Sequence, residues 1–163
     1  MPSRRAKFIG SHGKRYTLLG ACDITGFVHP ACMVVEHKTS SSDDDPTKGT
    51  VDGERFEEWV EKKLCPTLGD YVLREPRSVV ILDNVSFHHS KKVRELVEAT
   101  GAVLLYTSPY SPELNPIELF FAQYKKYLKR WRNLSWHDAH LGALASITPA
   151  NARQYFRKCG VPP

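Results

Sequence analysis

Residues 79–84 have the sequence VVILDN, and residues 109–118 have the sequence PYSPELNPIE. The first stretch is a continuous apolar, mostly β-branched run, which is typical of a strand buried on both faces of a sheet. Prolines keep the first part of the second stretch from forming regular structure, and Asn115 followed by Pro116 predicts the start of a helix. The two stretches therefore place Asp83 at the end of a strand and Glu118 in the first turn of a helix.

The segments on either side of these stretches predict an α/β domain with a mixed sheet. A turn separates two apolar runs, residues 16–22 and 27–36, which is typical of a β-hairpin. Ser90 is expected to cap a helix that runs to about residue 99, and residues 102–106 form the next strand. A strand, a helix and a strand of these lengths predict a right-handed crossover between parallel strands. Further helices are expected over residues 54–64, 115–132 and 149–158, with Ser135 and Asp138 as a capping box for another.

Length and composition set the class of protein. The chain has 163 residues, 41% of them hydrophobic, which fits one globular domain. It has no apolar run of roughly 18 residues and no signal-peptide pattern, so we expect a soluble, intracellular protein. The four cysteines form no Cys-x-x-Cys pair, which predicts reduced thiols and neither a zinc site nor a disulfide framework.

Positive charge is concentrated after Glu118. Residues 120–163 hold eight Lys or Arg side chains and one acidic residue, although the whole chain has a net charge of only +5. At about 100° per residue, Lys125, Lys129 and Arg132 fall on the same side of the predicted helix as Glu118. A carboxylate at the head of a basic row suits a site that holds a divalent metal together with a phosphate backbone. The alternative is a solvated helix face stabilised by pairs four residues apart.

Each acidic residue also has an ordinary structural explanation. Asp83 could cap a turn, and Glu118 could stabilise the helix dipole by about 0.3–1 kcal/mol. His88 and His89 are candidate zinc ligands near Asp83, but no third nitrogen ligand has suitable spacing. Residues 10–14 lack the spacing and the hydroxyl residue of a phosphate-binding loop.

Two motifs resemble the DDE endonuclease domain of mariner-like transposases, which is of the integrase type. They are VVILDNVSFHHS at residues 79–90 and LLYTSPYSPELNPIE at residues 104–118, with 34 residues between Asp83 and Glu118. The resemblance covers roughly residues 8–132. It implies an RNase H-like fold, a mixed sheet flanked by helices. It also implies three acidic residues that bind two Mg²⁺ or Mn²⁺ ions, with Asp83 as the second and Glu118 as the third. From the resemblance we also expect the chain to bind DNA, to form a homodimer with a second copy, and to be nuclear if its host is a eukaryote.

The first acidic residue of the family pattern has no counterpart here. It belongs on a strand ahead of the hairpin, and Asp23 lies in the hairpin turn, at the opposite end of the sheet from the expected ligands. We therefore expect a partial catalytic domain over residues 1–132 that lacks its first strand, and a helical extension over residues 133–163. Little or no cleavage is expected. The alternatives are a non-catalytic DNA-binding protein that uses the basic row, and a transposon-derived gene fragment that does not fold alone.

Overall fold

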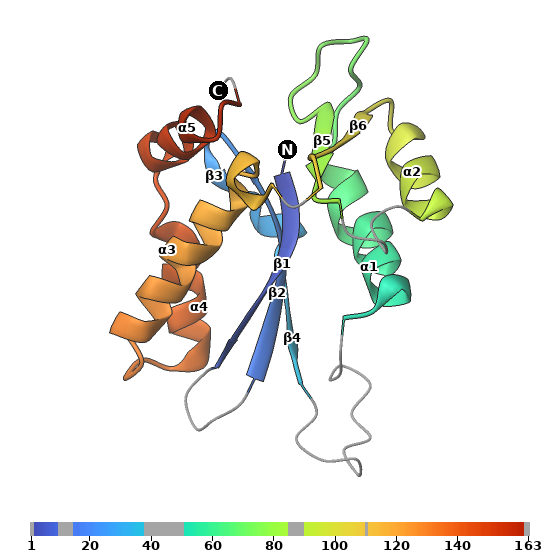
Figure 1. Cartoon of the computed structure of the whole chain (residues 1–163). Helices are drawn as coiled ribbons and strands as arrows, with labels where there is room; N and C mark the ends of the chain where they lie inside the picture. Colours follow the sequence, from blue (N-terminus) through green and yellow to red (C-terminus); the bar gives the residue numbers. More distant parts are fainter. Residues whose placement is uncertain (1, 10–14, 38–50, 85–89, 110, 162–163) are drawn as a thin grey trace.

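A mixed sheet forms the centre of the protein (Figure 1). The structure is a computed structural model that describes residues 2–9, 15–37, 51–84, 90–109 and 111–161. Within these residues the strand order is β3-β2-β1-β5-β6, and β4 also pairs with β2. The strands are β1 (Pro2–Ile9), β2 (Arg15–Asp23), β3 (Gly26–Phe27), β4 (Met33–Glu36), β5 (Val79–Leu82) and β6 (Val103–Tyr106).

Helices cover both faces of this sheet. The longer ones are α1 (Gly53–Trp59), α2 (Lys91–Glu98), α3 (Ile117–Arg130), α4 (Trp136–Ala145) and α5 (Pro149–Lys158). Single turns of helix are η2 (His29–Ala31), η4 (Cys65–Thr67) and η6 (Pro112–Leu114), and α1 continues as a π-helical segment, η3 (Val60–Leu64). The sequence-based expectation of an α/β protein with a mixed sheet flanked by helices, RNase H-like in architecture, is confirmed.

The predicted hairpin and crossover are both present. β2 pairs antiparallel with β3 and β4, and the turn between β2 and β3 is closed by Gly26, which has a φ of 141°. β5 and β6 pair in parallel, with α2 between them in the chain. The Ser90 hydroxyl accepts a hydrogen bond from the Val93 amide at 3.1 Å, so the predicted cap of α2 is confirmed.

The expectation that the sheet lacks a strand ahead of the hairpin is wrong. β1 lies between β2 and β5, antiparallel to the first and parallel to the second, with Ser3 opposite both Ala21 and Leu82. A strand in this position gains hydrogen bonds from two neighbours, and this tertiary pairing outweighs a weak local pattern. The sequence PSRRAKFI hides the strand because it combines a proline with three cationic residues. Pro2 is tolerated because it is the first residue of the strand.

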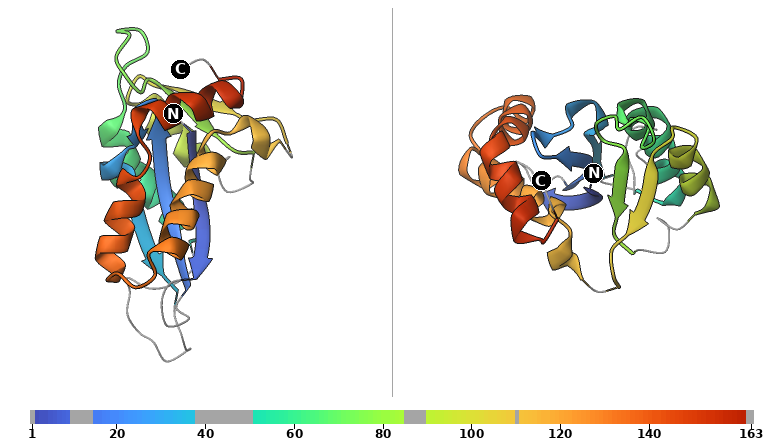
Figure 2. Two further views of the ribbon diagram at one scale, coloured as in Figure 1. Left: turned by 90° about the vertical axis from the view of Figure 1, so that its left-hand side faces the viewer. Right: turned by 90° about the horizontal axis from the view of Figure 1, so that it is seen from above.

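The core consists of two clusters of buried side chains, one on each face of the sheet. Side chains of α1, η3 and α2 pack on one face. Side chains of α3, α4 and α5 pack on the other, and the view from above in Figure 2 shows the two helical layers on opposite sides. α4 and α5 share their cluster with α3, across the predicted boundary at residue 132. The division of the chain at that residue stays a prediction.

Capping residues set the ends of the last three helices. The Ser135 hydroxyl accepts from the Asp138 amide at 3.2 Å, and Thr148 forms a capping box with Asn151 at the start of α5. α3 begins at Ile117, two residues after Asn115, whose side-chain oxygen accepts from the Ile117 amide at 3.3 Å. None of the described helices combines the length and the apolar composition needed to cross a membrane.

Candidate active site

Asp83 is the first residue after β5. The preceding carbonyl, that of Leu82, accepts a hydrogen bond from the Thr107 amide at 2.9 Å, so β5 and β6 stay paired to their last residues. Asp83 is 6% exposed, one of the few polar residues among those described that are this deeply buried. A carboxylate buried at the carboxyl end of a parallel strand lies where ligands bind in open α/β sheets.

Glu118 lies in the first turn of α3 and is half-buried. Its amide donates to the Asn115 carbonyl at 3.2 Å, which begins the turn. The right-hand view of Figure 2 shows that α3 begins on the side of the molecule where β5 and β6 end. The fold therefore brings the elements that carry Asp83 and Glu118 to one side of the sheet. The positive end of the helix dipole favours an anionic side chain at Glu118.

Asn115 is a site residue that the sequence reasoning treated only as a helix cap. It is fully buried, and its Oδ1 accepts from the Ile117 amide. Its Nδ2 atom is also buried, and no described residue accepts a hydrogen bond from it. A buried donor without an acceptor costs about 1–3 kcal/mol. The signal in the sequence was a polar residue enclosed by Leu114, Pro116 and Ile117.

The strand beside β5 contains several cationic residue types. β1 and β5 pair in parallel as far as Ser3 and Leu82, the residue before Asp83. β1 contains Arg4, Arg5 and Lys7 and no acidic residue. In the described part of the chain, no three His, Cys, Asp or Glu side chains group closely enough to hold a metal ion.

Asp23 does not take the place of a third acid. Its carboxylate accepts from the Thr25 amide at 2.7 Å and lies 3.2 Å from the Arg77 guanidinium. Arg77 precedes β5, so Asp23 lies at the opposite end of that strand from Asp83, as the sequence predicted. His88 and His89, the alternative zinc ligands, lie outside the described residues, as does the rest of the segment 85–89.

The predicted basic row lies on the surface. Lys125 and Lys129 are exposed on α3, and Arg132 is exposed in the turn that follows the end of the helix at Arg130. None of the three forms an ion pair with another described residue. Their charge is therefore available to an external anion, although Arg132 does not continue the helix as expected. Their role in DNA binding stays a prediction.

The oxygen atoms of Asp83 and Glu118 are of the type that binds a hard divalent cation. Carboxylate oxygens are the ligands that Mg²⁺ prefers, and proteins often hold this ion with one or two carboxylates together with substrate phosphates. Asp83 and Glu118 can supply those oxygens. The Asn115 Nδ2 atom is a buried hydrogen-bond donor, so it is not a ligand for a cation.

Comparisons with known proteins bear on the family and the fold of this chain. The family model of DDE superfamily endonucleases matches residues 31–139, more than half of the chain. The Mos1 transposase catalytic domain solved with raltegravir and Mg is 18% identical, with 98% of this chain and 82% of that chain covered and a TM-score of 0.51. A Mos1 paired-end complex with the left transposon end is 16% identical, with 98% and 55% covered and a TM-score of 0.54.

A viral protein shares the same architecture. A chain of the simian T-cell lymphotropic virus intasome, solved in complex with PP2A regulatory subunit B56 gamma, is 13% identical, with 90% of this chain and 46% of that chain covered and a TM-score of 0.51. A comparison with curated protein sequences gave no match. The structural likenesses establish the RNase H-like fold, and the family match identifies this chain as a member of the DDE superfamily endonucleases.

Proposed function

We propose that this chain acts on the phosphodiester backbone of DNA through a divalent metal ion held by Asp83 and Glu118. The observation that carries the proposal is that α3, which has Glu118 in its first turn, begins on the side of the molecule where β5 ends, and the buried Asp83 directly follows β5. The Mos1 catalytic domain has been solved with Mg and with Mn, which supports oxygen-ligated divalent metals as the cofactor.

Each residue of the site has a distinct role in this proposal. Mg²⁺ or Mn²⁺ bound there would polarise a phosphate and lower the pKa of a bound water. Asp83 and Glu118 supply the negative charge that holds the ion, and burial of Asp83 strengthens that attraction. Asn115 fixes the first turn of α3, because its Oδ1 accepts from the Ile117 amide, and it so helps to position Glu118.

Cleavage by the 163-residue chain is expected to be weak, because β1 contains no acidic residue that could supply a third carboxylate. The experiment is nicking of supercoiled plasmid DNA with Mn²⁺ or Mg²⁺. We expect weak nicking by the unaltered chain and none by Asp83→Asn or Glu118→Gln. Arg4→Asp adds a carboxylate to β1, one residue beyond the Ser3–Leu82 pair, and is expected to raise nicking by about tenfold or more, which corresponds to about 1.4 kcal/mol of barrier.

Arg5→Asp is the matched control for this gain of activity. It makes the same charge change one residue along β1, and successive residues of a strand alternate between the two faces of a sheet. Equal nicking by Arg4→Asp and Arg5→Asp would show that the gain does not come from a third metal ligand at position 4. Robust cleavage by the unaltered chain that is lost in Asp83→Ala would show that the chain needs no acid on β1. Circular dichroism of each variant checks that the fold is retained.

A second candidate function, DNA binding without cleavage, is favoured by the exposed row of Lys125, Lys129 and Arg132. Such contacts are independent of sequence and weaken as salt rises. We expect Lys125→Ala and Lys129→Ala each to weaken duplex binding and to lower the slope of log K against log salt by about one. Lys91→Ala on α2 is the control, because Lys91 is also exposed and pairs with Glu95 on the other face of the protein. Fluorescence anisotropy at two salt concentrations decides the matter.

A further inference from the structure

An exposed tryptophan lies in the turn that joins α3 to α4, at the opposite end of α3 from Glu118 (Figure 1). Trp131 is 43% exposed, although tryptophan side chains are mostly buried in folded proteins. Trp131 follows Glu118 by thirteen residues, and a helix rises 1.5 Å per residue, so about 20 Å separate the two positions along the helix. The turn is therefore a feature distinct from the proposed metal site.

Hydrogen bonds fix the backbone of Trp131 on both sides. Its N–H donates to the Tyr127 carbonyl at 3.0 Å, which ends α3, and its C=O accepts from the Leu134 amide at 3.1 Å. The Tyr127 ring lies beside the Trp131 ring, with the centroids 6.1 Å apart. A side chain at Gly142 would collide with the Tyr127 ring, so this ring is held against α4. Trp131 is therefore a partly exposed ring on an ordered support, and preorganisation of this kind lowers the entropic cost of binding.

The side chain of Arg130 shows that the Trp131 ring accepts a planar group on its face. The Cζ atom of its guanidinium lies 5.5 Å from the centroid of the ring, within the range of a cation–π contact. Arg130 is exposed, and no carboxylate among the described residues pairs with it. Guanidinium groups and nucleic-acid bases are both planar and both stack on aromatic rings. A base that approaches from solvent therefore competes with the Arg130 guanidinium for the same position.

Cationic residues flank Trp131 on both sides. Lys129, Arg130 and Arg132 lie within two positions of it, so their Cα atoms are no more than about 8 Å from its own. Lys129 and Arg132 are exposed, and neither forms an ion pair with a described residue. Asp138, in the first turn of α4, is the only acidic residue in the sequence from position 119 to position 163. Positive charge around an exposed aromatic ring suits a polyanion that also carries planar groups.

We propose that Trp131 stacks on an unpaired base of a single DNA strand, while Lys129 and Arg132 bind phosphates next to that base. The base takes the place of the Arg130 guanidinium on the ring, and Arg130 then pairs with a further phosphate. Stacking of this kind tolerates any sequence, because every base has a planar face. The bases of a duplex are stacked on one another inside the double helix, so Trp131 distinguishes single strands from double strands. DNA is the nucleic acid here because the proposal rests on the proposed function.

The test titrates a fluorescein-labelled thymidine strand of about 12 nucleotides with the full chain and measures anisotropy. A strand of the same length made of abasic nucleotides keeps the phosphates and lacks the bases. The thymidine strand paired with its adenosine complement serves as the duplex. We expect saturable binding of the thymidine strand and a Kd for the abasic strand that is higher by about tenfold or more.

Variants of the chain separate stacking from charge and from apolar contact. Trp131→Leu keeps an apolar side chain and removes the ring, so it should raise the Kd of the thymidine strand by about tenfold and leave that of the duplex unchanged. Trp131→Phe keeps a ring and should retain most of the affinity. Leu134→Ala is the matched control, because it shortens an exposed apolar side chain of the same turn and should change neither Kd. A cooperative thermal transition shows that each variant folds.

Four other outcomes each overturn the proposal. Equal binding of the abasic strand reduces the interaction to attraction between phosphates and a basic protein. An unchanged Kd in Trp131→Leu excludes stacking on this ring, and an equal loss of affinity in Leu134→Ala reduces it to apolar contact. Tighter binding of a uridine RNA strand than of the thymidine strand assigns the ring to RNA.

Nicking of plasmid DNA, measured in parallel, keeps this proposal apart from the proposed function. Nicking that depends on Asp83, together with undiminished binding of the thymidine strand by Trp131→Leu, refutes the stacking site and leaves the proposed function standing. Binding of the thymidine strand that depends on its bases and on Trp131, without nicking by the unaltered chain, supports the stacking site and counts against the proposed function.

Discussion

The two faces of the sheet are packed in different ways. Under α1 and α2 the buried cluster is mainly aliphatic, with Phe56 and Trp59 as its aromatic members. Under α3, α4 and α5 the cluster is rich in aromatic residues that meet edge to face, such as Phe27 and Phe120 with ring centroids 5.3 Å apart. The second face also contains a hydrogen bond of 2.6 Å between the Tyr124 hydroxyl and His140 Nδ1.

This difference bears on the site, because Glu118 belongs to the aromatic face. Aliphatic packing is non-directional and tolerates repacking, whereas edge-to-face rings and buried hydrogen bonds fix one arrangement. The aromatic side chains of α3 therefore set the position of its first turn as well as its stability. The face under α1 and α2 has no comparable link to Glu118 and serves mainly as support for the sheet.

Removal of one large ring from each face is the strongest test of this comparison. Phe120→Ala and Phe56→Ala both empty a fully buried site, and each should lower the free energy of unfolding by about 3–5 kcal/mol. Phe120 follows Glu118 by two residues and contacts Phe27, Tyr155 and Phe156. We expect Phe120→Ala to weaken Mn²⁺ binding as well, and Phe56→Ala to leave it unchanged where the chain remains folded. Urea denaturation and calorimetry measure the two effects, and equal metal affinity in both variants would contradict the assignment.

Tyr124→Phe tests the buried hydrogen bond alone. The substitution keeps the ring and leaves His140 Nδ1 without the tyrosine hydroxyl in a partly buried position. The expected loss of stability is about 1–3 kcal/mol, the cost of an unsatisfied buried polar group. Tyr71→Phe, at an exposed position before β5, is the control, because it deletes a tyrosine hydroxyl at the surface. A loss no larger than that of the control would show that the hydrogen bond contributes little.

Acid should lower the free energy of unfolding through His140, which lies on the aromatic face. Burial lowers the pKa of His140 below 6.5, with the neighbouring His137 and His29 adding to the effect. Below pH 6.5 the unfolded chain binds a proton at this residue that the folded chain does not, so stability falls with pH until the folded-state pKa is reached. His140→Gln should remove this part of the pH dependence, and His137→Gln, at an exposed position, should retain most of it. Urea titrations at several pH values distinguish the two.

The smallest expected change in the free energy of unfolding comes from an exposed ion pair on α2, on the face of the sheet opposite α3. The Lys91 ammonium lies 3.2 Å from the Glu95 carboxylate, and both side chains are exposed. Pairs of this kind, four residues apart on a helix, contribute about 0.3–0.5 kcal/mol. Lys91→Ala should therefore change the unfolding free energy by no more than this amount. A loss above about 1 kcal/mol would mean that the ion pair does more than stabilise α2 locally.

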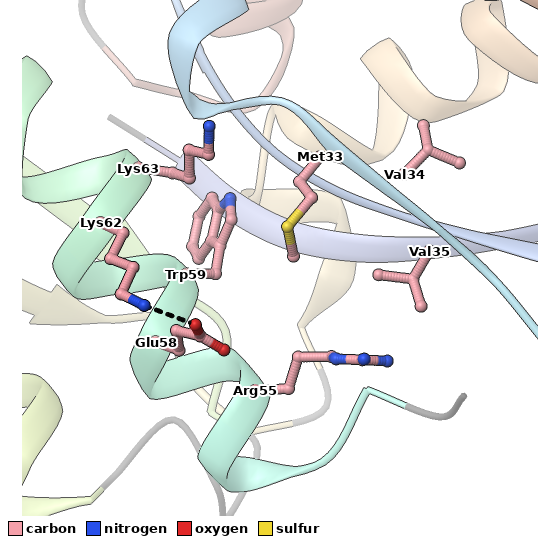
Figure 3. Close-up of a pocket in the computed structure, with 8 residues that line it drawn as sticks. All are labelled: Met33, Val34, Val35, Arg55, Glu58, Trp59, Lys62 and Lys63. Atoms are coloured by element: carbon pink, nitrogen blue, oxygen red, sulfur yellow. Dashed lines mark hydrogen bonds and ion pairs between the residues drawn. The ribbon is translucent and has the colours of Figure 1, made fainter. Parts of the chain in front are cut away.

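Local signals made much of the fold predictable. The helix caps at Ser90 and Ser135 depend on hydrogen bonds to amides three residues ahead, and both form as expected. The strand before Asp83 follows from its apolar run, and it also forms as expected. β1 was missed because its pairing is decided by β2 and β5, which come later in the chain. The pocket between Met33, Val35 and Trp59 (Figure 3) likewise depends on the approach of α1 to β4, which no local pattern encodes.

The site could be predicted only in part, for the same physical reason. Asp83 and Glu118 follow from a strand end and a helix start, both visible in the sequence. The burial of Asn115 depends on how the segment before α3 packs. The helix cap predicted from the sequence accounts for the Oδ1 atom of Asn115 and does not predict that the whole side chain is buried. The pairing of Ser3 with Leu82, the residue before Asp83, depends on sheet register, which a single sequence does not specify.

Calorimetric titration of the full chain with Mn²⁺ tests the central proposal most directly. We expect binding by the unaltered chain and a Kd raised by about tenfold or more in both Asp83→Asn and Glu118→Gln. Glu113→Gln is the matched control, an exposed carboxylate five residues before Glu118 that should leave the affinity unchanged. Affinity retained in Asp83→Asn, or lost equally in Glu113→Gln, would contradict a metal site formed by Asp83 and Glu118.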